Sequence, residues 1–518
     1  MNLIISGAYI NPSLAAEFGE LPPTMLPLKN KRLYIHQRKL FPENEKVFIS
    51  LPESYNIDEF DKINMQSINI EVISVNENLS LSQSIIFCLN YAGKYSENLN
   101  ILNGDTLFKE LDFNQTDYCA CTKPENNYKW DYIENKNLIY SGYFSFSNQN
   151  LLIKLILQEN YNFIKAIEDY SNIVSNYKYI EIKGWMDFGL LSTYFKSKSN
   201  FTTERVFNGL KIDKFSVLKE SFKKKKILAE AEWFKKIPSS LYQFTPRLWD
   251  FKENKDKSSY IIDFFHLSTL SDLYVYGRLP VFVWENIFSS FQNFISVCKI
   301  ESKNYELPSI NFSKIYYSKK TNTRLQQFQS ETNYDFNDCF FLNDKKFPSV
   351  NYIIDEMTNK FNENDFLFLS IIHGDLCFSN TLYDFKTESI KVIDPKGLID
   401  DNENSFFGDF RYDVAKISHS VIGLYDFIIA GNYFLEEKSN NNFNFKIYQN
   451  KNIEKIQTLF LNCKFNGFSL EELSIYPIMI NLFLSMLPLH NDMPERQKAF
   501  LCNAIRLYDE YKSKLTHV

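Results

Sequence analysis

Two short apolar runs within residues 371–397, IIHGDLCFSNTLYDFKTESIKVIDPKG, each lead into an aspartate. The first continues as H-x-D-x-x-x-x-N with His373, Asp375 and Asn380, and the second, KVIDP, ends at Asp394. Phosphoryl transfer needs one carboxylate that accepts the proton of an attacking hydroxyl, and oxygen ligands for Mg²⁺. We therefore predict that Asp375 accepts the proton and that Asn380 and Asp394 are metal ligands. The alternative is a strand–turn–strand in which these residues only cap turns.

Composition narrows the class of protein. A chain of 518 residues is too long for one ordinary core, so two to four domains are expected. The net charge of −6 argues against a general affinity for nucleic acid. The eight cysteines lack a second pair at zinc-binding spacing beside Cys119 and Cys121, which favours reduced thiols in a cytoplasmic protein.

Neither end of the chain predicts a membrane segment. The start, MNLIISGAYINPSLAA, has no basic region and only a short apolar run, unlike a signal peptide. The late apolar run IYPIMINLFLSMLPL is interrupted by Pro477, Asn481 and Pro488 and is too short to cross a bilayer. It predicts a core helix, and we expect no membrane insertion.

Apolar runs alternate with a helical pattern in the first part of the chain. NLIISG, EKVFISL, INIEVISV and LNILNGD predict buried strands, and LSQSIIFCLNYAGKY between the last two predicts a helix. This order predicts a doubly wound α/β sheet over about the first 190 residues. A boundary is expected between Ser197 and Asn208, which gives domains at 1–200 and 205–518.

The second part has a different pattern. FSVLKESFKKKKILAEAEWFKKIP predicts a strand, a solvated basic turn and a helix that ends before Pro238, and SSYIIDFF predicts another strand. Helical patterns dominate from about Leu270. The Asn-rich run EEKSNNNFNFKIYQNKN predicts a polar surface insertion.

The HGD motif, the later Asn380 and the ID before Pro395 resemble those of the aminoglycoside phosphotransferase and choline kinase group. The resemblance implies an α+β protein-kinase-like domain that phosphorylates a small molecule with ATP, with an N-lobe at about 205–268 and a C-lobe at about 269–518. It implies that Lys219 contacts the ATP phosphates and that Glu230 or Glu232, preferably Glu230, is the helix partner of this lysine.

Two further elements fit this resemblance, and one is missing. YIIDFFHLSTL resembles the hinge strand that holds adenine, and GDFRYDVAKISHS offers Asp413 as a brace for the catalytic loop, with His419 as a packed helix residue. A G-x-G-x-x-G loop does not precede Lys219; only Gly209 stands in that place.

In the first domain, LNILNGDTLF places Asp105 after a strand and KGWMDFGLLSTYF contains Asp187. Two such carboxylates can chelate one Mg²⁺ that orients a nucleoside triphosphate. With LPLKNKRL, these fragments resemble the sugar-phosphate nucleotidyltransferases, which implies a Rossmann-like fold. The glycine-rich loop with arginine that this family has after the first strand is replaced by GAYINPSLAAEFGELPP, and Lys29, Lys31 or Arg32 could substitute. A degenerate domain without catalysis is the alternative.

The pair of domains resembles two-domain proteins of bacterial capsule and surface-polysaccharide gene clusters. This implies a bifunctional enzyme that phosphorylates a small alcohol or sugar and then activates the phosphate with a second NTP, such as CTP or UTP, to an NDP-linked donor. A single-activity kinase and a non-catalytic pathway protein are the alternatives. Choline, ethanolamine, glycerol and a sugar all stay open as acceptors, and the oligomeric state is not predicted.

Overall fold

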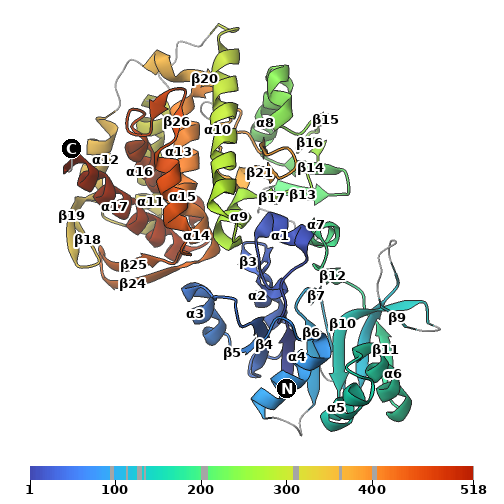
Figure 1. The fold of residues 1–518 in the computed structure, drawn as a ribbon. Coiled ribbons are helices and arrows are strands. Elements are labelled where there is room, and N and C mark those ends of the chain that lie inside the picture. The colour runs from blue at the N-terminus through green and yellow to red at the C-terminus, as the bar shows by residue number, and fades with distance from the viewer. Residues whose placement is uncertain are drawn as a thin grey trace. The chain divides into compact units, whose positions relative to one another are not determined.

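The chain forms two compact units in the computed structural model, which describes residues 1–93, 98–112, 115–124, 131–133, 136–199, 208–306, 314–360, 365–398 and 405–516 (Figure 1). Unit 1 comprises Met1–Phe201 and Tyr276–Arg278, and unit 2 comprises Thr202–Val275 and Leu279–Val518. Most of the predicted junction, at 200–207, lies outside the described residues.

Unit 1 is built on an eight-stranded sheet in the order β11-β8-β10-β6-β1-β4-β5, with β9 paired to β10. The central strand β1 (Asn2–Ile5) pairs in parallel with β4 (Val47–Pro52) and β6 (Leu99–Asn103), and β5 (Ile70–Val75) extends the sheet in parallel beyond β4. These are the predicted strands. Their near-continuous apolar sequences fit strands that are covered on both faces.

The rest of this sheet departs from the predicted doubly wound pattern. Strand β10 (Leu138–Phe146) runs antiparallel to β6, β8 (Tyr118–Thr122) and β9 (Tyr132–Ile133), whereas β11 (Lys178–Glu181) is parallel to β8. Parallel neighbours need a crossover connection, usually a helix. The residues described between β8 and β10 contain β9 and no helix, so an antiparallel return is the result.

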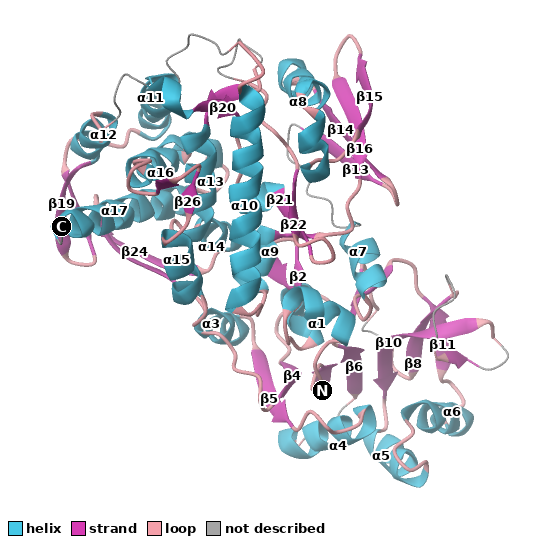
Figure 2. Ribbon diagram, turned by 45° about the horizontal axis from the view of Figure 1, so that its top comes forward, coloured by secondary structure: helices cyan, strands magenta, loops and turns pink. Residues whose placement is uncertain are grey.

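Three helices cover one face of the unit 1 sheet, as Figure 2 shows. Buried side chains of α4 (Leu81–Ala92), α5 (Gln149–Gln158) and α6 (Phe163–Ile173) form one cluster with apolar residues of β6, β8 and β10. The other elements of the unit are α1 (Pro12–Phe18), α2 (Leu33–Arg38), α3 (Glu59–Ser67), α7 (Leu191–Ser199), β2 (Pro27–Leu28), β3 (Lys31–Arg32), β7 (Thr106–Phe108) and β12 (Trp185–Asp187).

Unit 2 begins with a four-stranded antiparallel sheet in the order β13-β14-β16-β15. Its strands are β13 (Asn208–Ile212), β14 (Ser216–Ser221), β15 (Leu248–Glu253) and β16 (Ser258–Asp263). Helix α8 (Lys224–Lys236) packs on this sheet and ends before Pro238, as predicted.

The predicted basic turn at Lys223–Lys226 is wrong in part. Helix α8 already starts at Lys224, so three of the four lysines lie in its first turn. Lysine is a good helix former. Ion pairs from Lys224 to Glu253 (2.9 Å) and from Lys226 to Glu230 (3.7 Å) offset the unfavourable placement of positive charge at a helix N-terminus.

The rest of unit 2 is mainly helical. Its helices are α9 (Leu270–Tyr276), α10 (Val281–Ser302), α11 (Lys320–Thr332), α12 (Val350–Thr358), α13 (Phe410–Val421), α14 (Tyr425–Ala430), α15 (Ile453–Leu461), α16 (Ile475–Ser485) and α17 (Pro494–Thr516). Small sheets lie among them, formed by β17 (Ser268–Thr269) with β21 (Thr381–Asp384) and β22 (Ser389–Val392), by β20 (Leu369–Ile371) with β23 (Phe407–Asp409), and by β26 (Lys464–Phe465) with β27 (Phe468–Ser469).

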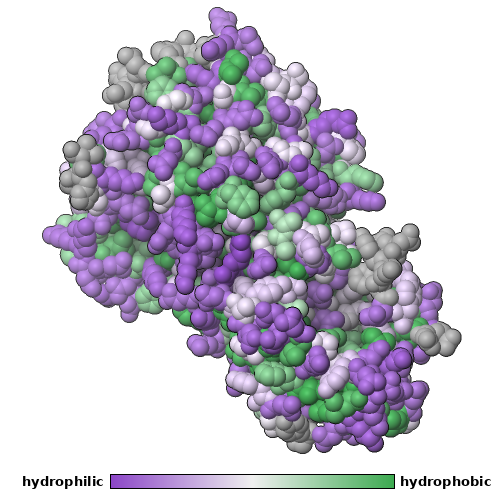
Figure 3. All heavy atoms as spheres, viewed as in Figure 1, coloured by the Kyte–Doolittle hydropathy of each residue, from purple (hydrophilic) through white to green (hydrophobic). Residues whose placement is uncertain are grey.

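The late apolar run forms the predicted core helix. Every residue of α16 is buried, and Pro477 occupies its first turn, where a missing N–H costs nothing. Among the described residues, the search for a helix long and apolar enough to cross a bilayer found none. On the face drawn in Figure 3, hydrophilic and apolar side chains are interspersed.

The Asn-rich run, predicted as a polar surface insertion, contains a β-hairpin whose first strand is mostly exposed. Strands β24 (Tyr433–Ser439) and β25 (Asn442–Ile447) pair with each other, and β25 joins β18 (Cys339–Leu342), which pairs with β19 (Lys345–Ser349). Phe443, Phe445 and Ile447 alternate with polar residues and are buried. This alternation is the strand signal that the asparagines obscured.

Phe378 holds the aspartate-bearing loop onto the core, and its removal should destabilise unit 2. It is fully buried against the rings of Tyr274, Trp284 and Phe291. We expect Phe378→Ala to lower the free energy of unfolding by about 3–5 kcal/mol, measured by urea titration with tryptophan fluorescence. Phe282→Ala, at a 63% exposed position of α10, is the control and should change it by less than about 0.5 kcal/mol. Equal losses in the two variants would contradict this packing.

Candidate active site

The loop that carries the HGD motif is held by backbone hydrogen bonds to one buried carboxylate. Asp413, in the first turn of α13, accepts the N–H groups of His373 (2.7 Å) and Gly374 (2.8 Å). Gly374 has φ +78°, and a Cβ there would lie 2.8 Å from the Cβ of Lys396. The predicted brace, Asp413, therefore makes the contacts that fix this turn, and glycine is required in it.

His373 supports the same loop from inside. Its Nε2 lies 3.0 Å from the carbonyl oxygen of Ile393, and the indole of Trp233 donates to the carbonyl of Ile372 at 2.8 Å. Burial lowers the pKa of His373 to about 4, so the imidazole is neutral at pH 7. His373 is a structural member of the site rather than a proton carrier.

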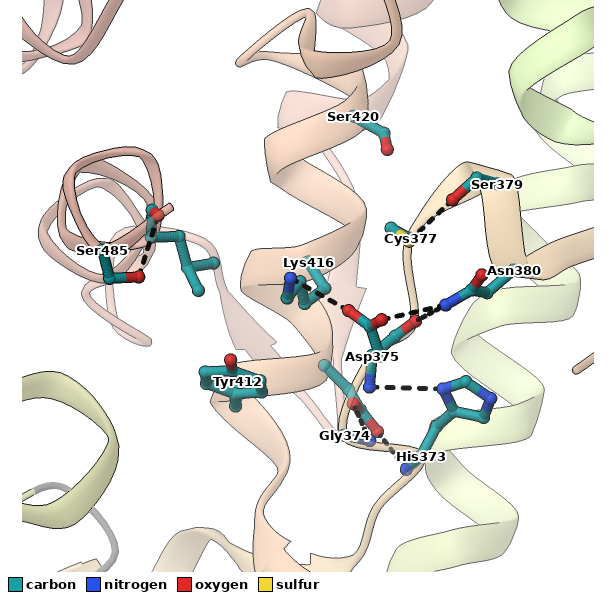
Figure 4. Close-up of polar contacts among 12 residues, drawn as sticks. His373, Gly374, Asp375, Cys377, Ser379, Asn380, Tyr412, Lys416, Ser420 and Ser485 are labelled. Carbon is teal, nitrogen blue, oxygen red and sulfur yellow. Dashed lines mark hydrogen bonds and ion pairs between the residues drawn. The ribbon is translucent and has the colours of Figure 1, made fainter. Parts of the chain in front are cut away.

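Asp375 presents its carboxylate between two partners, drawn in Figure 4. Its Oδ1 lies 2.9 Å from Nζ of Lys416, while Oδ2 accepts a hydrogen bond of 3.0 Å from the Asn380 amide. The side chain is 41% exposed. Burial raises the pKa of Asp375, but the Lys416 ammonium outweighs it, and the pKa lies below its ordinary range. The carboxylate is thus ionised and oriented.

The predicted pair of Lys219 and Glu230 forms a buried ion pair. Lys219 on β14 and Glu230 on α8 are almost fully buried, and their charged atoms lie 2.8 Å apart. Tyr260, the partner of Lys219 across β14 and β16, donates its hydroxyl to Glu230 at 2.8 Å. Glu232 instead pairs with Lys236 one helical turn away. Of the two predicted alternatives, Glu230 is the partner of the lysine.

Lys219 also joins the sheet to the second apolar strand of the motif. Its Nζ lies 3.0 Å from Oδ1 of Asp394. Burial opposes the charge on Lys219, but Asp394 and Glu230 together outweigh it and hold its pKa above the ordinary value. The three predicted residues therefore form one ion-paired chain across three elements.

Asn380 and Asp394 lie on neighbouring strand ends and suit a hard cation. The N–H of Ile393 donates to the Asn380 carbonyl at 2.9 Å, so the two residues are adjacent across β21 and β22. Because the Asn380 amide nitrogen faces Asp375, its side-chain oxygen is left as a donor to a metal. Amide and carboxylate oxygens are the ligands that Mg²⁺ takes. Asp394 has φ +58°, a strained conformation for a non-glycine residue, as functional residues often have.

In unit 1, Asp105 and Asp187 also come together. Asp105 follows β6, Asp187 ends β12, and the N–H of Phe188 donates to the Asp105 carbonyl at 2.8 Å. A Cβ on Gly189 would lie 2.7 Å from Oδ2 of Asp105 and 3.3 Å from Oδ1 of Asp187, so both carboxylates crowd the same glycine.

Within the described part of unit 1, no ion pair balances these carboxylates as Lys219 and Lys416 balance those of unit 2. Burial raises the pKa of Asp105, and burial together with the Asp105 charge raises the pKa of Asp187 to about 7. Among the described residues, Oδ2 of Asp187 is buried without a hydrogen-bond partner. Two converging carboxylates with an unsatisfied oxygen fit a divalent cation. The described residues contain no group of three or more His, Cys, Asp or Glu placed to hold a metal, so the site offers two carboxylates.

The three basic residues proposed to replace the missing loop arginine differ in accessibility. Arg32 is buried and pairs with Asp61 at 3.2 Å and Asp58 at 3.6 Å, so it is committed to the fold of unit 1. Lys29 and Lys31 are exposed. Because Arg32 is occupied by these buried ion pairs, it does not fit the role of a phosphate ligand.

Two residues of the unit 2 site were not predicted from sequence. Lys416 lies three residues after Asp413 on α13, and this helical spacing could have placed both beside the loop. The position of Tyr260 opposite Lys219 follows from the register between β14 and β16, which the sequence does not specify.

Comparisons with known proteins are distant. No family model matches the chain, and no curated protein matches it. Similar solved structures include a thermostable mutant of aminoglycoside phosphotransferase APH(4)-Ia in complex with AMP-PNP and hygromycin B, at 12% identity and TM-score 0.38, covering 58% of this chain and 91% of that one.

Another is aminoglycoside phosphotransferase APH(3'')-Id from Streptomyces rimosus, at 11% identity and TM-score 0.27, covering 52% and 87% of the two chains. A third is a glucose-1-phosphate thymidylyltransferase from Bacillus anthracis, at 13% identity and TM-score 0.31, covering 39% and 96%. At such low scores, we draw the function from the side-chain geometry alone.

The raised pKa of Asp187 predicts how unit 1 responds to pH and metal. Between the ordinary pKa of about 4 and about 7, folded Asp187 holds a proton that the unfolded chain has lost. In EDTA, the stability of unit 1 should therefore fall as pH rises through this window, by at most about 4 kcal/mol. Mg²⁺ should restore the melting temperature at pH 8 and have little effect at pH 5. Differential scanning calorimetry measures both.

Matched variants test the assignment to Asp187. Asp187→Asn should flatten the pH dependence and remove the Mg²⁺ effect on the unit 1 transition, whereas Asp131→Asn, at an exposed position of the same unit, should change neither. An unaltered Mg²⁺ effect in Asp187→Asn would show that the cation binds elsewhere.

Proposed function

We propose that unit 2 is a small-molecule kinase that transfers the γ-phosphoryl group of ATP to a hydroxyl of a small alcohol or sugar. The single observation that carries this is the ion-paired chain of Glu230, Lys219 and Asp394 beside the oriented carboxylate of Asp375. Lys219 would contact the ATP phosphates. Asn380 and Asp394 would hold Mg²⁺, which when bound neutralises charge on the β- and γ-phosphates.

In the proposed reaction the acceptor hydroxyl donates a hydrogen bond to Asp375, which orients it and takes its proton. A bond forms between the hydroxyl oxygen and the γ-phosphorus, and the bond from that phosphorus to the β–γ bridging oxygen breaks, its electron pair leaving with ADP. The low pKa of Asp375 makes it a weak base. Positioning therefore contributes more than proton abstraction, as phosphoryl transfer allows.

For unit 1 we propose nucleotidyl transfer, favoured by the paired carboxylates of Asp105 and Asp187. A phosphate oxygen of the phosphorylated product would attack the α-phosphorus of CTP or UTP, releasing pyrophosphate and giving an NDP-linked donor. The alternative is a single-activity kinase whose first domain is non-catalytic, since Arg32 is committed to buried ion pairs. A role in bacterial capsule or surface-glycan precursor synthesis, in the cytoplasm, stays a prediction from the sequence resemblance.

The roles of Glu230 and Glu232 can be separated by nucleotide binding. Glu230→Gln should weaken the affinity for AMP-PNP·Mg²⁺ about tenfold, because Lys219 then pairs with Asp394 alone and is drawn away from the phosphates. Isothermal titration calorimetry measures this affinity. Glu232→Gln removes the partly exposed pair with Lys236, away from Lys219, and should stay within twofold of the parent. Equal effects would refute the assignment of Glu230.

The two activities should be separable. In a screen of small alcohols and sugars with ATP·Mg²⁺, Asp375→Asn should lower ADP formation by about 10²–10⁴-fold with little change in AMP-PNP affinity. Asp187→Asn should leave ADP formation intact and abolish pyrophosphate release from CTP or UTP with the phosphorylated product.

Two results would change this assignment. Loss of both activities in one folded variant would rule out independent sites. A kinase that releases no pyrophosphate with any pair of NTP and phosphomonoester would establish the single-activity alternative.

A further inference from the structure

Positively charged side chains gather beside Asp375, on the side opposite Asn380. Lys416 on α13 lies 2.9 Å from Oδ1 of Asp375 and 6.0 Å from the ring centre of Tyr412. The same tyrosine accepts a hydrogen bond of 2.8 Å on its hydroxyl from Lys320, the first residue of α11. Figure 4 shows Lys416 and Tyr412 next to Asp375. Two ammonium groups thus flank one tyrosine at the exposed edge of this carboxylate.

Two more cations belong to this group. Arg324 lies one turn after Lys320 on α11 and donates to the carbonyl of Ser485 at 3.2 Å. Lys396 bonds through its backbone N–H to the His373 carbonyl at 2.8 Å, so it lies at the turn that leads into the aspartate. We call Lys320, Arg324, Lys396 and Lys416 the basic cluster; all four side chains are partly exposed.

The members of the basic cluster act on one another. Burial lowers the pKa of Lys320 well below its ordinary value, and Lys396, Arg324 and Lys416 lower it further, while Asp375 alone opposes them among the charges that act most on it. The carboxylate of Asp413 accepts hydrogen bonds from the N–H groups of His373 and Gly374. Burial raises the pKa of Asp413 to about 7, so it offsets little of this positive charge. Three of the four charges that act most on Lys320 are thus positive, and a bound anion would offset their repulsion.

The basic cluster lies on the acceptor side of the proposed reaction. The nucleotide side is defined by Lys219, Asp394 and Asn380, and it is Oδ2 of Asp375 that faces Asn380. Lys416 holds Oδ1, the other oxygen of the same carboxylate. An alcohol whose hydroxyl reaches Asp375 from the side away from the metal would meet α11 and α13 with the rest of its structure.

We propose that the acceptor of unit 2 is an anionic alcohol, in which a carboxylate or phosphate group binds Lys320 and Arg324 while its hydroxyl lies at Asp375. This rests on the proposed kinase function and narrows its substrate class. Basic side chains recognise carboxylates and phosphates through charge-assisted hydrogen bonds. The same charges disfavour choline, ethanolamine and other cationic acceptors through like-charge repulsion.

Binding to the AMP-PNP·Mg²⁺ complex tests this by calorimetry with matched probes: glycerol, glycerate, glycerol 3-phosphate, inorganic phosphate and choline. At least one anionic probe should bind at least tenfold more tightly than glycerol, and choline should not bind. Glycerate and glycerol 3-phosphate distinguish a carboxylate site from a phosphate site. Failure of every anionic probe to exceed glycerol would overturn the proposal, as would competition between these anions and AMP-PNP.

Variants assign the effect to the cluster. Lys320→Gln with Arg324→Gln should weaken the best anionic probe at least tenfold, and Lys319→Gln, an exposed lysine next to Lys320, should not. Equal anion binding in the double variant, with folding checked by circular dichroism, would overturn the proposal. Failure of wild-type protein to bind AMP-PNP·Mg²⁺ would instead refute the kinase function itself, so the two failures are distinguishable.

Discussion

The buried ion pair of Lys219 with Glu230 is the contact on which the site of unit 2 depends. A lysine on a strand and a glutamate on a helix lose their hydration when both are buried, and only their mutual contact and added hydrogen bonds offset that loss. Tyr260 supplies one such hydrogen bond, and Asp394 supplies a second carboxylate to the lysine. Because α8, the sheet and the strand end at Asp394 meet at one ammonium group, none of the three can shift without exposing a buried charge.

Helix α13 organises the other half of the site. Asp413 fixes the turn at His373 and Gly374 through its backbone, and Lys416, one turn later, reaches the Asp375 carboxylate. A single helix thus sets both the path of the loop and the direction of its reactive side chain. This arrangement places a cation, rather than a second acid, next to Asp375, and so the charge of the acceptor side follows from the same element that builds the loop.

The sequence predicted residues whose role follows from position along one strand or loop. Asp375 and Asp394 follow apolar runs, Asn380 lies five residues after Asp375, and the structure brings the three to neighbouring positions. Residues whose role depends on spatial proximity were harder to predict. Helix packing places Lys416 beside Asp375, and strand register places Tyr260 beside Lys219. The ion pair between Arg32 and Asp61 cannot be predicted from a motif either.

Errors in the predicted elements have similar causes. Strand β10 runs antiparallel to β6 and β8, and the residues described between β8 and β10 form no crossover helix, which an apolar run does not reveal. The composition of the Asn-rich run predicted a polar surface insertion without its hairpin, although alternating Phe443 and Phe445 already carried the strand pattern. At Lys224–Lys226, local charge suggested a turn, but ion pairs with Glu253 on β15 and with Glu230 on the same helix support a helix.

The two candidate sites manage buried acidic charge in opposite ways. In unit 2, Asp394 and Asp375 each have an ammonium partner within 3.0 Å, so their charge is compensated before any ligand binds. In unit 1, Asp105 and Asp187 lie beside the same glycine, and burial together with the Asp105 charge raises the pKa of Asp187 to about 7. At the proposed sites, a metal bound in unit 1 would displace a proton, whereas a metal bound in unit 2 would compete with Lys219 for Asp394.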